Sequence, residues 1–312
     1  MMTQKQQQHL VSLVLVASLA ARCWAEGETC ELSGASFGPD SSFLVITRVQ
    51  INGGADELQR HDQLAETTLS KMKESLPGLL HSTFDCNSES CVWSEGLSSD
   101  AAMAAKCADP AFVSYLSKAE VSGVEVYGSV GSETLELIAK THGGVQVKHF
   151  KTRLGYNRLG RWPVSNRVVE SSFGRKTPFI LLARSKIKEG KVEEYLKSAQ
   201  KADNGVQATE PRMLHHTLDA DPECDRCFVW SEIYANDDGF LFHISNPPLL
   251  KHFEEFAEVG ESFSVELYGT LDADTIAKAA ELNLPTTYRP TKFGFSRIDS
   301  WDPAWKAIPS DQ

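Results

Sequence analysis

The sequence predicts an α+β fold in which two ferredoxin-like βαββαβ units follow one another in a single chain of 312 residues. Two observations predict this fold. The chain repeats itself, because the motif Val-Trp-Ser-Glu occurs at 92–95 and 229–232, and similar apolar runs begin at Phe43 and Phe179. Each copy also shows the same order of strand and helix patterns. The offset between matching segments drifts only from 136 to 141 residues, which indicates a duplication. The predicted first unit, linker and second unit span 37–162, 163–178 and 179–305.

The elements follow from the periodicity of apolar residues, which is two in strands and about 3.6 in helices. The first copy reads as strand 43–51, helix 55–74, strand pair 79–85 and 91–95, helix 99–118, and a strand ending in Tyr127. The second copy reads as strand 179–187, helix 191–204, strand pair 213–219 and 227–234, helix 237–257, and a strand ending in Tyr268. Pro110 and Pro247 interrupt the second helix of each copy, because proline lacks the backbone N–H that a helix interior needs. A short helix, at 132–141 or 273–282, precedes each tail.

Each predicted sheet carries both of its helices on one face, so its other face must be covered by something else. Two sheets packed face to face within one chain satisfy this need. We therefore expect a monomer that contains an internal pseudo-dimer.

Residues 1–25 have the features of a secretory signal peptide: Lys5, an apolar stretch at 10–21, and a small residue, Ala25, before the cleavage point. We therefore expect a protein of the secretory pathway or the extracellular space, not anchored in a membrane after the peptide is removed. The formal charge of −11, from 42 acidic and 31 basic residues, argues against nucleic acid as a partner. A small-molecule partner is more consistent with this charge.

Six cysteines remain after the signal peptide, and an even number in an exported chain suggests disulfides. Two pairs are close in sequence, Cys86 with Cys91 and Cys224 with Cys227. By elimination Cys30 is left with Cys107. Connectivity cannot be read from sequence alone, and a redox Cys-x-x-Cys or a four-cysteine zinc site are alternatives that need a special local context.

The strand at 228–234 separates its side chains into two rows, because successive residues of a strand point to opposite faces. Val229, Ser231 and Ile233 form a compact row that suits packing under the helices. The other row contains Trp230, Glu232 and Tyr234, a mixture of aromatic groups and a carboxylate that predicts a ligand cavity facing the other sheet. Other notable positions on the strands are Arg184, His215 and Tyr268. An ion pair between Arg184 and Glu232 that closes the sheets is the structural alternative.

Residues present in only one unit are better functional candidates than residues that both units share. His243 follows Glu232 by eleven residues, whereas the corresponding position of the first unit is Lys106. His252 corresponds to Tyr115. An imidazole is the side chain best able to transfer protons near neutral pH, so both histidines are candidates for function.

The second unit resembles the antibiotic-biosynthesis monooxygenase superfamily of dimeric α/β barrels. The resemblance rests on the start of the first strand with Gly190, on Trp-Ser-Glu-Ile-Tyr at 230–234, on His243, and on the run from Ser245 to Phe253. It covers 178–271 directly and 42–129 through the internal repeat. Members normally dimerise through their sheets, so the resemblance implies a fused pseudo-dimer of the dimeric α/β barrel.

Some members of this superfamily oxidise aromatic, phenol-like molecules with O2 and without metal or flavin. Here the resemblance implies His243 and Glu232 as catalytic groups, with Arg184 stabilising an oxyanion. Trp230, Tyr234, His215, Tyr268 and His252 are the implied substrate-binding residues. No metal and no cofactor are expected.

Other members isomerise small molecules or degrade haem. Haem is therefore the alternative ligand, with His252 at the position of the haem-ligating histidine. Arg184 and Tyr234 stand where the haem degraders have Asn and Trp, which argues against haem chemistry. A non-catalytic binding protein and a filled structural barrel are further alternatives.

Overall fold

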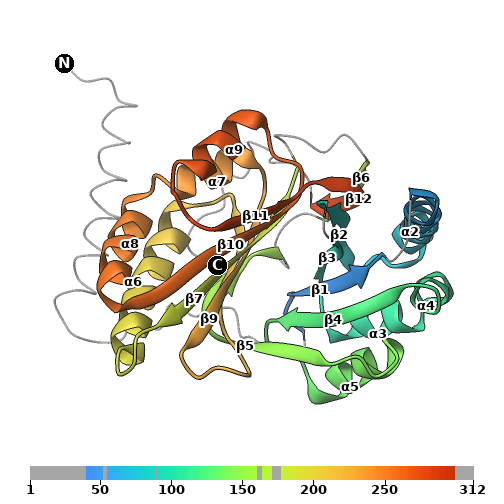
Figure 1. Ribbon diagram of the computed structural model, residues 1–312, viewed down its shortest axis with the longest axis horizontal. Coiled ribbons are helices and arrows are strands. Elements are labelled where there is room, and N and C mark those ends of the chain that lie inside the picture. Colours follow the sequence, from blue (N-terminus) through green and yellow to red (C-terminus); the bar gives the residue numbers. More distant parts are fainter. Residues whose placement is uncertain (1–39, 52–54, 89, 160–163, 171–176, 299–312) are drawn as a thin grey trace, which may run out of the picture. The chain divides into compact units, whose positions relative to one another are not determined.

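The computed structural model describes residues 40–51, 55–88, 90–159, 164–170 and 177–298. The expected signal peptide and Cys30 lie outside these residues. Both units have the predicted βαββαβ order (Figure 1). The first unit contains β1 (Phe43–Gln50), α2 (Ala55–Ser75), β2 (Leu79–Cys86), β3 (Cys91–Leu97), α3 (Asp100–Ala108), α4 (Pro110–Leu116), β4 (Glu120–Tyr127), α5 (Ser132–Thr141), β5 (Val147–Asn157) and β6 (Val164–Glu170). The second contains β7 (Phe179–Ile187), α6 (Val192–Thr209), β8 (Met213–Ala220), β9 (Cys227–Tyr234), α7 (Asp237–His243), α8 (Pro247–Val259), β10 (Gly260–Tyr268), α9 (Ala273–Ala280), β11 (Thr286–Arg289) and β12 (Thr291–Ile298).

The prolines divide the second helical stretch of each unit into two short helices, as predicted. Pro110 stands in the first turn of α4, where its missing N–H would have no helical partner. Asp109 caps this helix, since its carboxylate accepts hydrogen bonds from the backbone N–H of Ala111 and Phe112. Pro247 begins α8 in the same way. The break between α7 and α8 places His243 at the end of the first short helix and His252 within the second.

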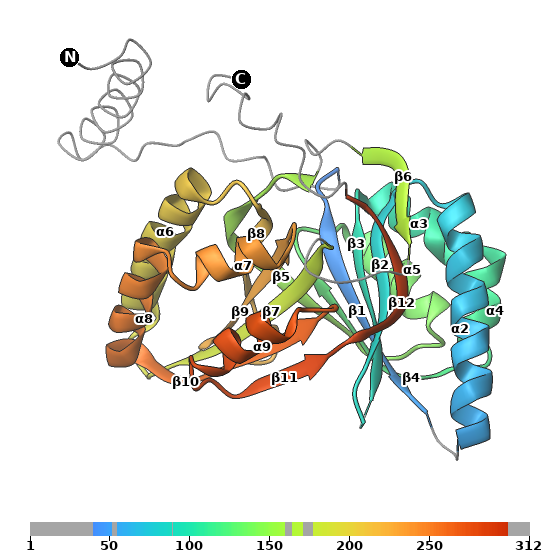
Figure 2. The same cartoon turned by 90° about the horizontal axis from the view of Figure 1, so that it is seen from above.

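Each unit ends in a C-terminal tail, which is β5 in the first unit and β11 with β12 in the second. These tails connect the two units. The strand order is β11-β10-β7-β9-β8-β5-β4-β1-β3-β2-β12-β6. Strand β5 runs parallel to β4 of its own unit and then pairs antiparallel with β8 of the second. Strand β11 runs parallel to β10, and β12 pairs antiparallel with β2 of the first unit. Each tail thus joins the sheet of its own unit to the sheet of the other (Figure 2).

Hydrogen bonds to buried aspartates repeat this exchange on both sides. The hydroxyl of Thr291, on the second tail, donates to the carboxylate of Asp85 on β2 at 2.6 Å. The hydroxyl of Thr152, on the first tail, donates to Asp219 on β8 at 2.8 Å. Burial raises the pKa of both carboxyl groups to about 7, although these hydroxyl donors lower it in part.

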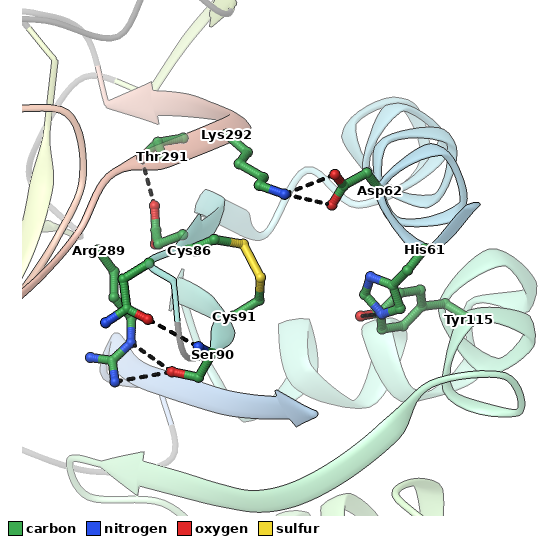
Figure 3. Close-up of a disulfide and its surroundings, with 11 residues drawn as sticks. His61, Asp62, Cys86, Ser90, Cys91, Tyr115, Arg289, Thr291 and Lys292 are labelled. Carbon is green, nitrogen blue, oxygen red and sulfur yellow. Dashed lines mark hydrogen bonds and ion pairs between the residues drawn. A yellow bond between two sulfur atoms is a disulfide. The ribbon is translucent and has the colours of Figure 1, made fainter. Parts of the chain in front are cut away.

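Further contacts fix the second tail on the first unit (Figure 3). The Arg289 guanidinium donates to the hydroxyl of Ser90 at 3.2 Å, beside the disulfide at the end of the β2–β3 hairpin. Lys292 forms an ion pair of 2.8 Å with Asp62 on α2. The two tails are therefore part of the sheet.

The segment 163–178, predicted as a linker, contains a strand. Residues 164–170 form β6 and pair with β12 at the edge of the sheet order. The chain between the units therefore also takes part in the sheet.

The helices pack on the outer faces of the sheets and the inner faces meet each other. Two apolar clusters lie between sheet and helices, one in each unit. A third joins the units and includes Leu44, Ile46, Ile180, Val229 and Ile233. The face-to-face packing predicted from the need to cover both sheet faces is confirmed.

Cys86 is bonded to Cys91 and Cys224 to Cys227, as the sequence spacing predicted. Cys107 is buried and has no disulfide partner among the described residues. Its expected partner, Cys30, lies outside them, so that pairing stays a prediction. No helix of the described part of the chain is long and apolar enough to cross a membrane.

His81 on β2 makes the fold sensitive to acid. It is fully buried, and neither ring nitrogen has a hydrogen-bond partner among the described residues. Burial lowers the pKa of His81 from 6.5 to about 4, so the unfolded chain takes up this proton at a higher pH than the folded chain. The contribution of His81 to folding stability must therefore fall as the pH drops from about 6.5 to about 4.

We expect this histidine to remove about 2 kcal/mol of stability between pH 8 and pH 5. Urea unfolding at both pH values, on the wild type and on His81→Leu, measures the difference. The variant should lose less stability on acidification than the wild type. An equal loss in both proteins would show that His81 is not the group responsible.

Candidate functional site

A cavity lies in the second unit between the sheet and its helices. Its volume is about 50 Å³, and side chains of β7, β8, β9, β10 and helices α6 to α9 line it. Most of the wall is apolar. The polar side chains of the wall include His216, Glu232, His243 and His252.

The alternation along β9 brings the expected aromatic row to this cavity. Trp230, Glu232 and Tyr234 line it, whereas Val229 and Ile233 pack between the two sheets. The separation into two rows is as predicted, but each row faces the opposite way: the aromatic row faces the helices, and the aliphatic row faces the other sheet. The cavity lies under the helices and not between the sheets, because the compact aliphatic row fills the space where the sheets meet.

His243 is held by a carboxylate. Its Nδ1 lies 2.9 Å and 3.0 Å from the two carboxylate oxygens of Glu210, which follows the last residue of α6. The side-chain amide of Asn246 donates to the same carboxylate at 2.6 Å. His243 and Glu210 are both buried. With Nδ1 engaged in this way, Nε2 is the ring nitrogen left to bind another group.

His216 on β8 is held in the same manner. Its Nδ1 lies 2.8 Å from Asp203 on α6, and its ring stacks on Trp230 with 4.4 Å between ring centres. Burial by itself lowers the pKa of His216, but hydrogen bonding to Asp203 and the nearby carboxylates raise it above the usual value.

Glu232 lies between the two histidines. Its Oε2 accepts a hydrogen bond of 2.5 Å from the Tyr234 hydroxyl, and its Oε1 lies 3.9 Å from Nε2 of His216. One ring nitrogen of each histidine and one oxygen of Glu232 all lie within 4.8 Å of one another. Burial, and then the Glu232 charge, raise the pKa of Tyr234 well above its usual value, so Tyr234 is a neutral donor.

His252 lines another part of the cavity. Its Nδ1 lies 2.8 Å from the hydroxyl of Ser198, and its ring meets Trp230 edge to face. Burial lowers the pKa of His252 to about 4, so its ring is neutral at physiological pH.

Three predicted site residues lie on the opposite face of the sheet, away from the cavity. Arg184 pairs with Glu266 at 2.7 Å and Glu125 at 3.0 Å, and not with Glu232. The Tyr268 hydroxyl donates to Glu266 at 2.5 Å. His215 is buried beside Thr217 and Ser231 in the same inner layer. Alternation along β7, β8 and β10 directs these side chains toward the first unit.

Sequence reasoning missed His216, Asp203 and Glu210. The signal for His216 was present, because it directly follows His215 and therefore points to the opposite face. The hairpin of β8 and β9 pairs His216 with Glu232 directly. Asp203 and Glu210 carry no such signal, since they approach the histidines only when α6 packs on the sheet.

The first unit fills the corresponding place with an ion pair. Lys106 on α3 contacts the carboxylate of Glu95 on β3, and both are fully buried. Ser82 donates to the same carboxylate at 3.3 Å. The Lys106 ammonium lies 4.0 Å from the centre of the Phe112 ring. Thus the partner of Glu95 is the ammonium group of a lysine side chain, whereas Glu232 lies between two histidines.

Comparison with known proteins gives only structural matches. No family model and no curated protein matches this sequence. A candidate monooxygenase from Lactobacillus acidophilus NCFM is 14% identical with a TM-score of 0.45, over 73% of this chain and 93% of that one. A candidate monooxygenase from Fusobacterium nucleatum is 11% identical with a TM-score of 0.46, over 72% and 90%.

A candidate antibiotic-biosynthesis monooxygenase from Bacteroides thetaiotaomicron is 23% identical with a TM-score of 0.28. It matches over 30% of this chain and 88% of its own length. The chain is similar in structure to antibiotic-biosynthesis monooxygenases. This is the family that the sequence of the second unit resembles.

The ion pairs of Arg184 predict a structural role for this residue. Arg184→Met leaves two largely buried carboxylates with fewer cations, and we expect the free energy of unfolding to fall by about 3 kcal/mol. Lys186→Met is the matched control on the same strand, because Lys186 pairs with Glu261 at the surface and should contribute less than about 1 kcal/mol. Urea unfolding of both variants measures the two values. Similar small losses would contradict the structural role.

Proposed function

We propose that this protein is a monooxygenase that oxidises a small aromatic or phenolic molecule with O2 in the cavity of the second unit. The observation that carries the proposal is the His243–Glu210 pair at the polar end of a mostly apolar cavity. An imidazole held at Nδ1 by a carboxylate presents Nε2 as a base. The apolar wall suits an aromatic ring, and Trp230 and Tyr234 supply flat surfaces for it.

The proposed reaction begins when Nε2 of His243 takes the proton of the substrate hydroxyl. Glu210 balances the positive charge that this leaves on the imidazole. The electron-rich phenolate transfers an electron to O2, and the two radicals combine to form a carbon–oxygen bond. The resulting peroxide anion takes back the proton held by His243. The base then removes the ring C–H proton at the oxygenated carbon as the O–O bond breaks, and the released hydroxide takes up that proton to form water. One oxygen atom stays on the ring as a quinone carbonyl, so a phenol and O2 give a quinone and water.

The cavity limits the size of the substrate. Its volume of about 50 Å³ is below the range of about 300–1,000 Å³ that is common for drug-sized ligands. We therefore expect a substrate of one or two rings, admitted as side chains at the mouth move apart. A tetrapyrrole is much larger than this cavity, and His252 is already bonded to Ser198. The residues present therefore do not fit haem.

We also propose that the protein is secreted and monomeric. The two disulfides support an oxidising compartment, where such bonds form and persist. The tail strands that join the two sheets within one chain support an internal pseudo-dimer.

The test is O2 uptake with a panel of mono- and dihydroxylated aromatic compounds, using protein treated with a chelator. We expect His243→Ala to lower kcat/KM about 10²- to 10⁴-fold, because the variant lacks the base. His149→Ala is the control, since His149 lies on β5 and bonds to the carbonyl of Gly128. Undiminished turnover in His243→Ala would overturn the proposed role of His243. No O2 uptake with any compound of the panel would count against the oxygenase itself.

A further inference from the structure

We propose that His216, Glu232 and His243 bind a divalent transition-metal ion. Their side chains come from β8, β9 and α7, and all three are buried. One ligand atom from each lies within 4.8 Å of the other two. Ligand atoms that share a tetrahedral metal ion at about 2.1 Å lie about 3.4 Å apart, so binding needs each of the three atoms to move by less than about 1 Å.

The free atoms of these residues are the ones that a metal requires. Nδ1 of His216 is engaged with Asp203 and Nδ1 of His243 with Glu210, which leaves Nε2 of each ring. Such carboxylate partners orient metal-binding histidines and increase their basicity. In Glu232, Oε2 accepts the Tyr234 hydroxyl, so Oε1 remains for the metal.

The charges at this place also favour a cation. Asp203, Glu210 and Glu232 are all buried, and buried carboxylates are costly without a counter-charge. The nearby Arg158 guanidinium donates to the main-chain carbonyls of Gln207, Glu210 and Met213 instead of to these carboxylates.

The first unit supports the same conclusion. There the ammonium group of Lys106 neutralises Glu95, which corresponds to Glu232. The second unit has His243 at the Lys106 position, so Glu232 lies among imidazole nitrogens, which can bind a metal ion, where Glu95 has an ammonium group.

The donor set defines the class of metal. Two imidazole nitrogens and one carboxylate suit Zn²⁺, Co²⁺, Fe²⁺ or Mn²⁺, whereas Ca²⁺ and Mg²⁺ prefer oxygen ligands only. A cavity of about 50 Å³ has room for a few water molecules, which can complete the coordination.

Metal binding stands on this geometry and does not depend on the proposed reaction. Its consequence does rest on the proposed function, because the metal and the substrate proton use the same Nε2 of His243. We therefore expect the bound metal to inhibit the metal-free oxygenase.

The test is a titration of the chelator-treated, disulfide-bonded mature protein with Co²⁺, followed by its visible d–d absorption, and with Zn²⁺ by calorimetry. We expect one ion per chain. His216→Gln, Glu232→Gln and His243→Gln should each weaken binding by at least about 100-fold. Glu210→Gln, which removes only an orienting group, should weaken it about 10- to 100-fold. His252→Gln is the matched control in the same cavity and should keep the wild-type affinity.

Circular dichroism checks that each variant is folded, and added Zn²⁺ should raise the melting temperature of the wild type and of His252→Gln more than that of the other variants. Absence of one-to-one binding by the folded wild type, or equal affinity in His216→Gln and His252→Gln, would overturn the site. O2 uptake measured with and without Zn²⁺ separates the two proposals. Activity that requires the metal would support the site and overturn the metal-free reaction. Metal binding without any oxygenase activity would support the site alone.

Discussion

The structure depends on the need to cover both faces of the sheet in each unit. Helices cover the outer face, and the inner face of each sheet is apolar, with residues such as Leu44, Ile46, Ile180 and Ile233. Neither unit can leave this face in water without a large cost, so the two sheets pack on each other. The tail strands β5 and β12 then pair with the sheet of the other unit. The duplication supplies both halves of the arrangement in one chain.

This arrangement lets the two units diverge. The inner layer is shared, and its charged residues repeat: Arg48 and Arg184 both contact Glu125 and Glu266. The space between sheet and helices is not shared, because each unit has its own. The first unit fills it with the Glu95–Lys106 ion pair, whereas the second keeps a cavity with two histidines. A change at the Lys106 position therefore alters one cavity without disturbing the inner layer.

The three polar side chains at one end of the cavity come from three different elements, β8, β9 and α7. His216 and Glu232 face each other because β8 and β9 are paired in register. His243 comes from α7 and reaches them because the helix breaks before Pro247. The proposed proton transfer and the proposed metal binding both use Nε2 of His243, and both depend on the Glu210 carboxylate that holds Nδ1 of this histidine.

The sequence by itself determined the duplication, the element order and the division of β9 into two rows, because these follow from local patterns. The cysteine spacing suggested the two local disulfides, and the structure decided them. The sequence also singled out Glu232 and His243. Only the tertiary structure decided which face of the sheet meets the helices. The cavity therefore lies under the helices, and Arg184, His215 and Tyr268 lie on the opposite face, away from it. The partners Asp203 and Glu210 were likewise decided by the packing of α6 on the sheet. Such contacts join residues that are far apart in the chain, and no local pattern records them.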